Sequence, residues 1–287
     1  MATPLELAGH VAARLGQIDG VVAVVLGGSR VRGQAHDDSD IDLGLYYRSG
    51  RRPALAALRA LACELDDRHP PDAATDFGEW GPWINGGAWL LIDGHHVDWL
   101  YRDLDRVAHM IDECRAGRPT IDYQIGHPHG FHNHMYMGEV HYCRPLHDPS
   151  GALAPLKALT TPYPPLLKRA LIEKFLFEAD FALMICEKLP ARGDVFAAAG
   201  NLFRCVACLV QVLFALNETH FINEKGAVCT AAAFALRPDG FGATVSNVLA
   251  RPGTAATLQS SVHQLRHLVA DVRALCAAPV EALSAPR

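Results

Sequence analysis

The amino-acid sequence predicts an α+β chain: a small mixed β-sheet with flanking helices, followed by an all-α helical-bundle domain. Two short apolar runs rich in β-branched residues have the length of buried strands, at 21–26 and 41–47. Long, mostly apolar stretches of helical length follow later, at 166–189, 195–216 and 255–275. A length of 287 residues favours two domains, which we expect to span 1–150 and 151–287.

Helical and strand patterns alternate in the first half of the chain. Apolar residues recur at helical spacing in three segments, Pro4–Ile18, Pro53–Leu65 and Leu104–Cys114. The run VVAVVL at 21–26 is apolar on both faces, which is typical of a strand buried on both sides. Asp93-Gly94 joins two β-rich runs and predicts a hairpin turn. Residues 117–165 are rich in Gly, Pro and His, and we expect irregular structure there.

Composition excludes several function classes. The net charge is −5, so strong non-specific binding to nucleic acid is not favoured. The most apolar segment, Val206–Leu216, is shorter than the roughly 20 residues that a membrane span needs. The first residues lack a basic and then apolar leader, so we expect no signal peptide. Eight cysteines lie mostly among apolar neighbours, which indicates reduced core thiols and a cytoplasmic protein.

Acidic residues gather in front of the second predicted strand, in the stretch GGSRVRGQAHDDSDIDLGLYY at 27–47. On a strand, Asp40 and Asp42 point to one face while the apolar residues between them point to the other. In the run HHVDWLY, Asp98 likewise faces away from its apolar neighbours. If this run forms a strand beside 41–47, Asp98 joins Asp40 and Asp42. Hard carboxylate oxygens suit Mg²⁺, and three of them from two strands can hold two metal ions. We therefore predict a two-metal site at Asp40, Asp42 and Asp98.

Small residues precede these acids. Gly27, Gly28 and Ser29 lie between a strand and a predicted short helix, where backbone N–H groups and a hydroxyl can approach a phosphate chain. Arg32, or Arg30, can neutralise phosphate oxygens in bidentate fashion. One loop can thus serve both phosphate and metal.

These residues resemble the nucleotidyltransferase signature of the DNA polymerase β superfamily. The shared parts are a hydrophobic strand, Gly-Ser, an Arg three residues after the Ser, and Asp-x-Asp, as in GGSRVRGQAHDDSDIDL. The pattern is similar to GSxARG…SDIDL of bacterial minimal and antibiotic-modifying (aminoglycoside-type) nucleotidyltransferases, with Val31 in place of the usual Ala. The signature covers about 20 residues, a looser architectural match reaches residue 105, and the all-α second half resembles their helical substrate domain.

The resemblance implies roles for individual residues. Gly28 and Ser29 would hold the triphosphate of an NTP, with ATP as the expected nucleotide and Arg32 assisting. Asp40 and Asp42 would bind Mg²⁺, while Asp98 would complete the second metal site and accept the proton of the attacking hydroxyl. The implied reaction transfers a nucleoside monophosphate to a hydroxyl and releases pyrophosphate.

The acceptor is expected to be a small hydroxylated molecule, of which an aminoglycoside-like antibiotic is the leading class. We expect it to bind between the two halves of the chain. Glu139 is an alternative general base, because some antibiotic nucleotidyltransferases use a Glu from the later part of the chain. Two other functions stay open, namely AMP transfer to a protein or RNA, as in antitoxin-like relatives, and nucleotide sensing without catalysis. A homodimer also stays open.

Other polar residues have structural interpretations. Asp93 fits a hairpin turn and Asp103 a helix N-cap, while Asp37 and Asp38 are read as solvated loop acids. The segment 127–143 holds five histidines. For it we weigh a metal site, a wall of the acceptor pocket and an ordinary surface connection.

Overall fold

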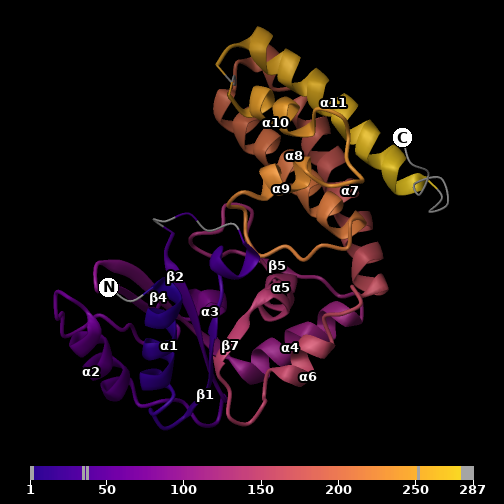
Figure 1. The fold of residues 1–287 in the computed structure, drawn as a ribbon. Coiled ribbons are helices and arrows are strands. Elements are labelled where there is room, and N and C mark those ends of the chain that lie inside the picture. Colours follow the sequence, from indigo (N-terminus) through magenta and orange to yellow (C-terminus); the bar gives the residue numbers. More distant parts are fainter. Residues whose placement is uncertain (1–2, 34–35, 37–38, 251–252, 279–287) are drawn as a thin grey trace. The chain divides into compact units, whose positions relative to one another are not determined.

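The computed structural model describes residues 3–33, 36, 39–250 and 253–278 (Figure 1). By its contacts the chain divides into two compact units: Met1–Cys114 with Thr120–Pro162, and Arg115–Pro119 with Tyr163–Arg287. Every regular element described in the second unit is a helix. A mixed sheet followed by a helical region confirms the predicted fold class. A domain boundary near residue 150 stays a prediction.

The first unit is built on a five-stranded sheet with the order β3-β4-β2-β1-β7. The strands are β1 (Val21–Leu26), β2 (Ile41–Tyr47), β3 (Gly87–Ile92), β4 (His95–Asp103) and β7 (Arg144–His147). β2 and β4 pair in parallel, whereas all the other neighbours pair antiparallel. β1 and β2 begin and end at the residues predicted from the sequence. A second sheet pairs β5 (Ile121–Asp122) with β6 (Phe131–His132).

One face of the large sheet is the core of this unit. Helices α1 (Pro4–Leu15) and α2 (Leu55–Leu65) pack there in one buried cluster with side chains of β1, β2, β3 and β4. Ile41, Leu43 and Leu45 of β2 are fully buried in that cluster. The residues between them, Asp42 and Gly44, are only half-buried. The strand alternation therefore leaves the second sheet face for polar groups.

That second face is covered over part of its length by α5 (His134–Tyr142). Tyr46 of β2 and Arg102 of β4 are buried there, and Arg102 forms an ion pair with Glu139 of α5. The short helix α3 (Gly81–Ile84) belongs to the same layer, since the Tyr136 hydroxyl donates to the carbonyl of Trp83.

The irregular structure predicted for 117–165 is wrong in part. This segment contains α5, the edge strand β7, the short sheet β5–β6 and α6 (Ala154–Ala158). α5 has no amphipathic pattern because six of its nine residues are buried. In β7, Pro145 pairs with Val25 at the sheet edge, where a missing N–H is tolerated. Neither element has a sequence signal that periodicity alone detects.

The other predicted elements of this unit are present. The hairpin turns at Asp93-Gly94, where both residues have positive φ (51° and 77°). Helix α4 (Leu104–Arg115) follows β4, and a 3₁₀ turn, η1 (Arg30–Arg32), follows β1.

The second unit contains the three long helices that the sequence predicts, α7 (Pro165–Cys186), α8 (Val195–Leu216) and α11 (Ala255–Ala277). It also contains three shorter helices that were not predicted, η2 (Pro190–Arg192), α9 (Ala227–Ala232) and α10 (Phe241–Ala250). These span only one to three turns, too short for a clear periodic pattern.

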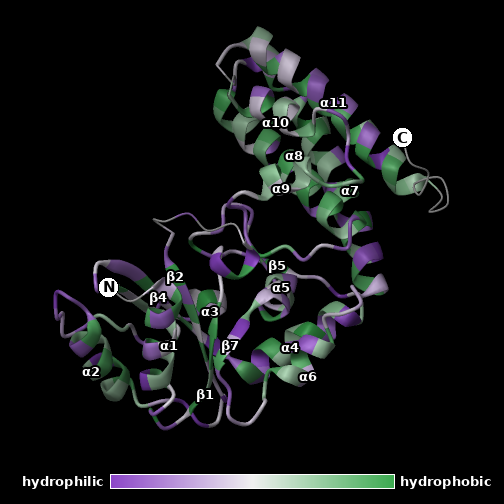
Figure 2. Cartoon of the chain, viewed as in Figure 1, coloured by the Kyte–Doolittle hydropathy of each residue, from purple (hydrophilic) through white to green (hydrophobic). Residues whose placement is uncertain are grey.

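Helix α8 is apolar over a longer stretch than the segment Val206–Leu216 considered from the sequence (Figure 2). Within the described residues it is the one helix whose length and composition would suit a membrane span, over 22 residues. However, 72% of its most apolar window is buried inside the structure. A buried core helix meets the same criteria, so this feature alone is weak support for a membrane span.

Asp66, at the C-terminal end of α2, joins that helix to β3. Its buried carboxylate accepts from the Arg68 guanidinium (2.8 and 2.6 Å) and from the Leu91 N–H (3.0 Å). The hydrogen bonds from Arg68 hold the pKa of Asp66 well below its usual value of 3.8, although burial opposes this.

We predict that Asp66→Asn lowers the free energy of unfolding at pH 7 by about 2 kcal/mol, because it disrupts these bonds. A folded-state pKa below the unfolded one adds stability above the unfolded pKa, and this stability is lost as pH falls. The difference between wild type and variant should therefore shrink below about pH 4. Urea unfolding at pH 7 and pH 3 measures it, and an equal difference at both would contradict this role.

Candidate active site

Asp42 and Asp98 are direct neighbours on the sheet. β2 and β4 run parallel in a register that pairs Asp42 with Asp98. Strands in a sheet lie about 4.8 Å apart, so the two side chains leave the same face side by side. Both are half-buried, and the flanking Ile41 and Val97 are fully buried on the opposite face. The structure thus brings together two of the three carboxylates proposed from the sequence.

Asp40 lies two residues before Asp42, just outside β2, and its side chain is exposed. The main chain at this point is held by Arg30, whose Nε donates to the Asp40 carbonyl at 3.0 Å. The Arg30 guanidinium also donates to the Ser39 carbonyl. Arg30, which the sequence left as an alternative phosphate ligand, therefore positions the entry to β2.

The Gly-Ser turn lies directly against the Asp42 carboxylate. The Gly27 N–H donates to the Asp42 carbonyl at 2.8 Å. Gly28 has a φ of +64°, and a Cβ built on it would lie only 1.7 Å from Oδ2 of Asp42. The carboxylate therefore occupies the space that any side chain at position 28 would need. Ser29 follows at the start of η1, and its side chain makes no capping bond to that turn.

Arg32 folds back over the same turn. Its Nε donates to the Gly28 carbonyl at 3.3 Å, and the residue is half-buried. The turn therefore has Arg32 and the Asp42 carboxylate against it, and Asp98 lies beside Asp42 on the next strand.

These residues fit a bound Mg²⁺ ion by their chemistry. The donor set consists of carboxylate oxygens, the ligand type that Mg²⁺ prefers. Like charges directly opposite on a sheet are destabilising, and a divalent cation converts that repulsion into coordination. Because Gly28 has no side chain, the Asp42 carboxylate can lie directly against the main chain of the turn.

Glu139 lies on α5, and its carboxylate is paired with Arg102 of β4. Its two carboxylate oxygens accept from Nε and Nη2 of Arg102, both at 2.7 Å. Arg102 pairs with Tyr46, four residues along the strands from the pair Asp42–Asp98. At about 3.3 Å per residue this register places Arg102 about 13 Å away. In the structure the Glu139 carboxylate is therefore engaged by Arg102.

We predict a structural effect for Glu139→Gln. The Arg102 side chain is 3% exposed, so the variant leaves a buried charge without its partner. The free energy of unfolding should fall by about 3 kcal/mol, and the double variant with Arg102→Met should recover part of that loss. Urea denaturation measures both. Unchanged stability together with lost nucleotidyl transfer would instead make Glu139 the general base.

The structure also shows the surroundings of other residues that were interpreted from the sequence. Asp103 accepts from the N–H groups of Asp105 and Arg106 at the start of α4, as an N-cap does. Asp37 and Asp38 lie outside the described residues. In the histidine-rich segment 127–143, the side chains of His129, His132 and His134 are buried, so an ordinary surface connection is wrong.

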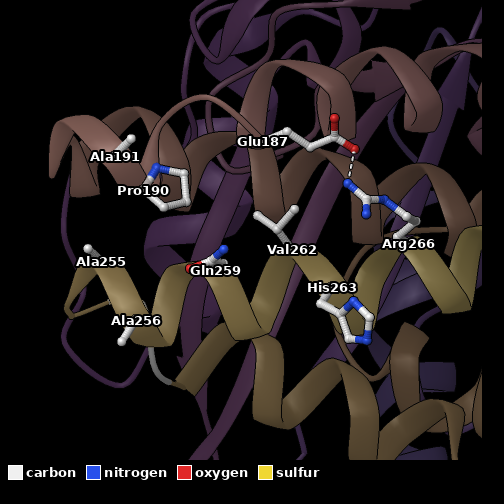
Figure 3. A pocket seen from close by; sticks show the side chains of 9 residues that line it. All are labelled: Glu187, Pro190, Ala191, Ala255, Ala256, Gln259, Val262, His263 and Arg266. Carbon is white, nitrogen blue, oxygen red and sulfur yellow. Dashed lines mark hydrogen bonds and ion pairs between the residues drawn. The ribbon is translucent and has the colours of Figure 1, made fainter.

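A cavity of about 430 Å³ is formed by residues of the helical unit (Figure 3). It is lined by Glu187, Pro190, Ala191, Ala255, Ala256, Gln259, Val262, His263 and Arg266. Arg266 and Glu187 form an ion pair in its wall, at 2.5 Å. None of the residues proposed from the sequence lines it. We therefore locate the candidate site by its donor set and not by this cavity.

Sequence reasoning missed Trp89, which pairs with Asp98 across β3 and β4. Directly paired residues of an antiparallel pair share a face, so the indole stands beside the carboxylates. The sequence could have predicted this position, because a two-residue turn at Asp93-Gly94 fixes the register that places Trp89 opposite Asp98.

Comparisons with known proteins give family-model matches to two parts of the chain. Residues 10–101 match the family model described as a nucleotidyltransferase domain. Residues 134–225 match a domain of unknown function (DUF4037). No curated protein matches the chain. A solved structure of a nucleotidyltransferase-like protein from Exiguobacterium sibiricum is similar over 92% of this chain and 74% of its own, with 10% identity and a TM-score of 0.41. The family match, which spans Gly28, Asp42 and Asp98, supports the nucleotidyltransferase superfamily for residues 10–101 of this chain.

Proposed function

We propose that this protein transfers a nucleoside monophosphate from an NTP, with ATP preferred, to a hydroxyl of a small acceptor. The observation that carries the proposal is the register pairing of Asp42 with Asp98 beside the Gly28 turn. Two adjacent carboxylates that can hold a cation, beside a tight glycine turn, would supply the charge neutralisation and positioning that phosphoryl transfer needs.

The proposed roles follow from this geometry. The turn at Gly28 and Ser29 presents N–H groups and a hydroxyl to the β- and γ-phosphates, with Arg32 beside it. Asp42, Asp98 and Asp40 would hold Mg²⁺, which when bound would supply charge neutralisation at the phosphate oxygens. Two ions fit three carboxylates.

The reaction is a displacement at the α-phosphorus. The acceptor oxygen forms a bond to phosphorus, and the bond from phosphorus to the β-phosphate oxygen breaks. Pyrophosphate leaves with the bonding electrons. The hydroxyl proton passes to the Asp98 carboxylate, which lies on the sheet face next to Asp42.

For the acceptor, we propose a small cationic hydroxylated molecule such as an aminoglycoside. The support is the net charge of −5, since opposite charge raises the encounter rate. The similarity of GGSRVRG…SDIDL to antibiotic-modifying nucleotidyltransferases points to the same class.

The test uses each of four α-³²P-labelled NTPs with Mg²⁺ and a panel of aminoglycosides and lincosamides. Wild type and Asp40→Ala are run side by side, following label transfer and pyrophosphate release. Labelled small product from wild type alone supports the proposal and identifies the acceptor class. Label transferred only to protein or RNA of a cell lysate would replace the small acceptor with a macromolecule. Metal-dependent NTP binding with no transfer at all would contradict the proposal and favour a sensor.

A further inference from the structure

Trp89 is the large apolar side chain next to the carboxylates. It lies on β3, directly opposite Asp98, and is 64% exposed. Its neighbours on the strand, Ala88 and Leu90, are buried in the core on the opposite sheet face. The indole therefore stands on the polar face, in solvent. Phe177 and Phe196 are more exposed, so Trp89 is distinguished by its place beside the carboxylates and not by exposure alone.

The indole is supported by a second ring. Trp80 stacks on Trp89 with ring centroids 4.3 Å apart and planes 19° from parallel. A Cβ built on Gly87 would lie 1.7 Å from the Trp99 carbonyl oxygen and 3.0 Å from the Trp80 ring, so the glycine lets both lie close to β3. The Trp80 carbonyl also accepts from Nε2 of Gln124 at 2.6 Å. Trp89 is thus held as a flat, pre-oriented surface, which lowers the entropic cost of binding a ring.

The order of groups across the sheet puts Trp89 on the side from which the acceptor would approach in the proposed reaction. Reading from β1 to β3, the face presents the Gly28 turn, Asp42, Asp98 and Trp89. In a displacement at phosphorus the attacking and leaving oxygens lie roughly in line. If pyrophosphate leaves at the Gly28 turn, the attacking hydroxyl approaches from the side of Asp98 and Trp89.

We propose that Trp89, backed by Trp80, is the stacking surface for a hydroxylated ring of the acceptor. This inference rests on the proposed function and narrows its acceptor to ring-bearing molecules, such as sugars and cyclitols. A sugar ring offers an apolar C–H face to the indole while an adjacent hydroxyl points to Asp98. The ring fixes which hydroxyl reaches phosphorus.

The test compares wild type with Trp89→Ala and Trp89→Phe by calorimetry. The probes are kanamycin, lincomycin and myo-inositol, each titrated into protein saturated with Mg²⁺ and a non-hydrolysable ATP analogue. Leu5→Ala is the control, since Leu5 is 44% exposed on α1, which packs on the other sheet face. At least one probe should bind wild type, with its dissociation constant raised about ten-fold in Trp89→Ala. Trp89→Phe should lie between, and Leu5→Ala should match wild type.

Binding of the ATP analogue alone separates the two claims. It should be the same in wild type and Trp89→Ala. Weaker analogue binding in Trp89→Ala would assign the indole to the nucleobase and overturn the inference, as would ring-probe binding that ignores Trp89 or is absent from wild type. Failure of wild type to bind the analogue with Mg²⁺ would instead overturn the proposed function.

Discussion

Asp42→Asn is expected to reduce nucleotidyl transfer by on the order of a thousand-fold, the largest effect of any single substitution proposed for this protein. The variant keeps the volume of the side chain and removes one negative charge from the pair with Asp98. It should therefore fold normally, because Ile41 and Leu43 on either side stay buried in the core. Pyrophosphate release at saturating NTP measures the effect.

Asp93→Asn is the matched control for that substitution. Asp93 lies in the hairpin turn next to β4 with a φ of 51°, a conformation that Asn adopts readily. It loses the same charge in the turn of the hairpin that carries Asp98, five residues along the chain from that carboxylate. Normal activity in Asp93→Asn and lost activity in Asp42→Asn is the expected result. Equal losses would show a general charge effect, and no loss in Asp42→Asn would exclude Asp42 from the reaction.

Gly28→Ala is expected to have the second largest effect, a loss of at least about a hundred-fold from displacement of the Asp42 carboxylate. The new Cβ would lie 1.7 Å from Oδ2 of Asp42, so that carboxylate must move. Gly33 provides a close control in the same loop. Its φ is +67° against +64° at Gly28, and a Cβ there meets no described atom within 4 Å.

Both glycine variants bear the same backbone cost of about 1–2 kcal/mol for an L-residue at positive φ. The difference between them therefore isolates the contact with Asp42. We expect Gly33→Ala to keep most of its activity while Gly28→Ala loses it, with comparable thermal midpoints. Similar activity in the two variants would mean that the fit between Gly28 and Asp42 is not needed.

Much of the first unit could be predicted because its signals are local. The strand at 41–47 is defined by strict alternation, with Ile41, Leu43 and Leu45 buried and Asp42 and Gly44 not. Gly28 and Asp42 lie in one short stretch of chain, so their shared role is visible as a spacing. The parallel pairing of β2 with β4 joins segments far apart in the sequence. From the sequence that pairing could therefore only be assumed, as the condition under which Asp98 lies beside Asp42.

Other features of the site depend on contacts that no local pattern encodes. Glu139 is a plausible base by sequence, but its ion pair with Arg102 depends on how α5 packs on the sheet. α5 itself lacks amphipathic spacing because most of it is buried. Arg30 and Arg32 are equivalent by sequence, and only the structure shows that Arg30 bonds the main chain at Ser39 and Asp40.

Metal-dependent nucleotide binding tests the central claim most directly. Binding of Mn²⁺, as a spectroscopic substitute for Mg²⁺, is followed by electron paramagnetic resonance with and without a non-hydrolysable ATP analogue. Wild type, Asp42→Asn, Asp98→Asn and Asp93→Asn are compared. The account predicts analogue-dependent Mn²⁺ binding in wild type and Asp93→Asn, and its loss in Asp42→Asn and Asp98→Asn. Equal Mn²⁺ binding in all four proteins would contradict a metal and nucleotide site at these carboxylates.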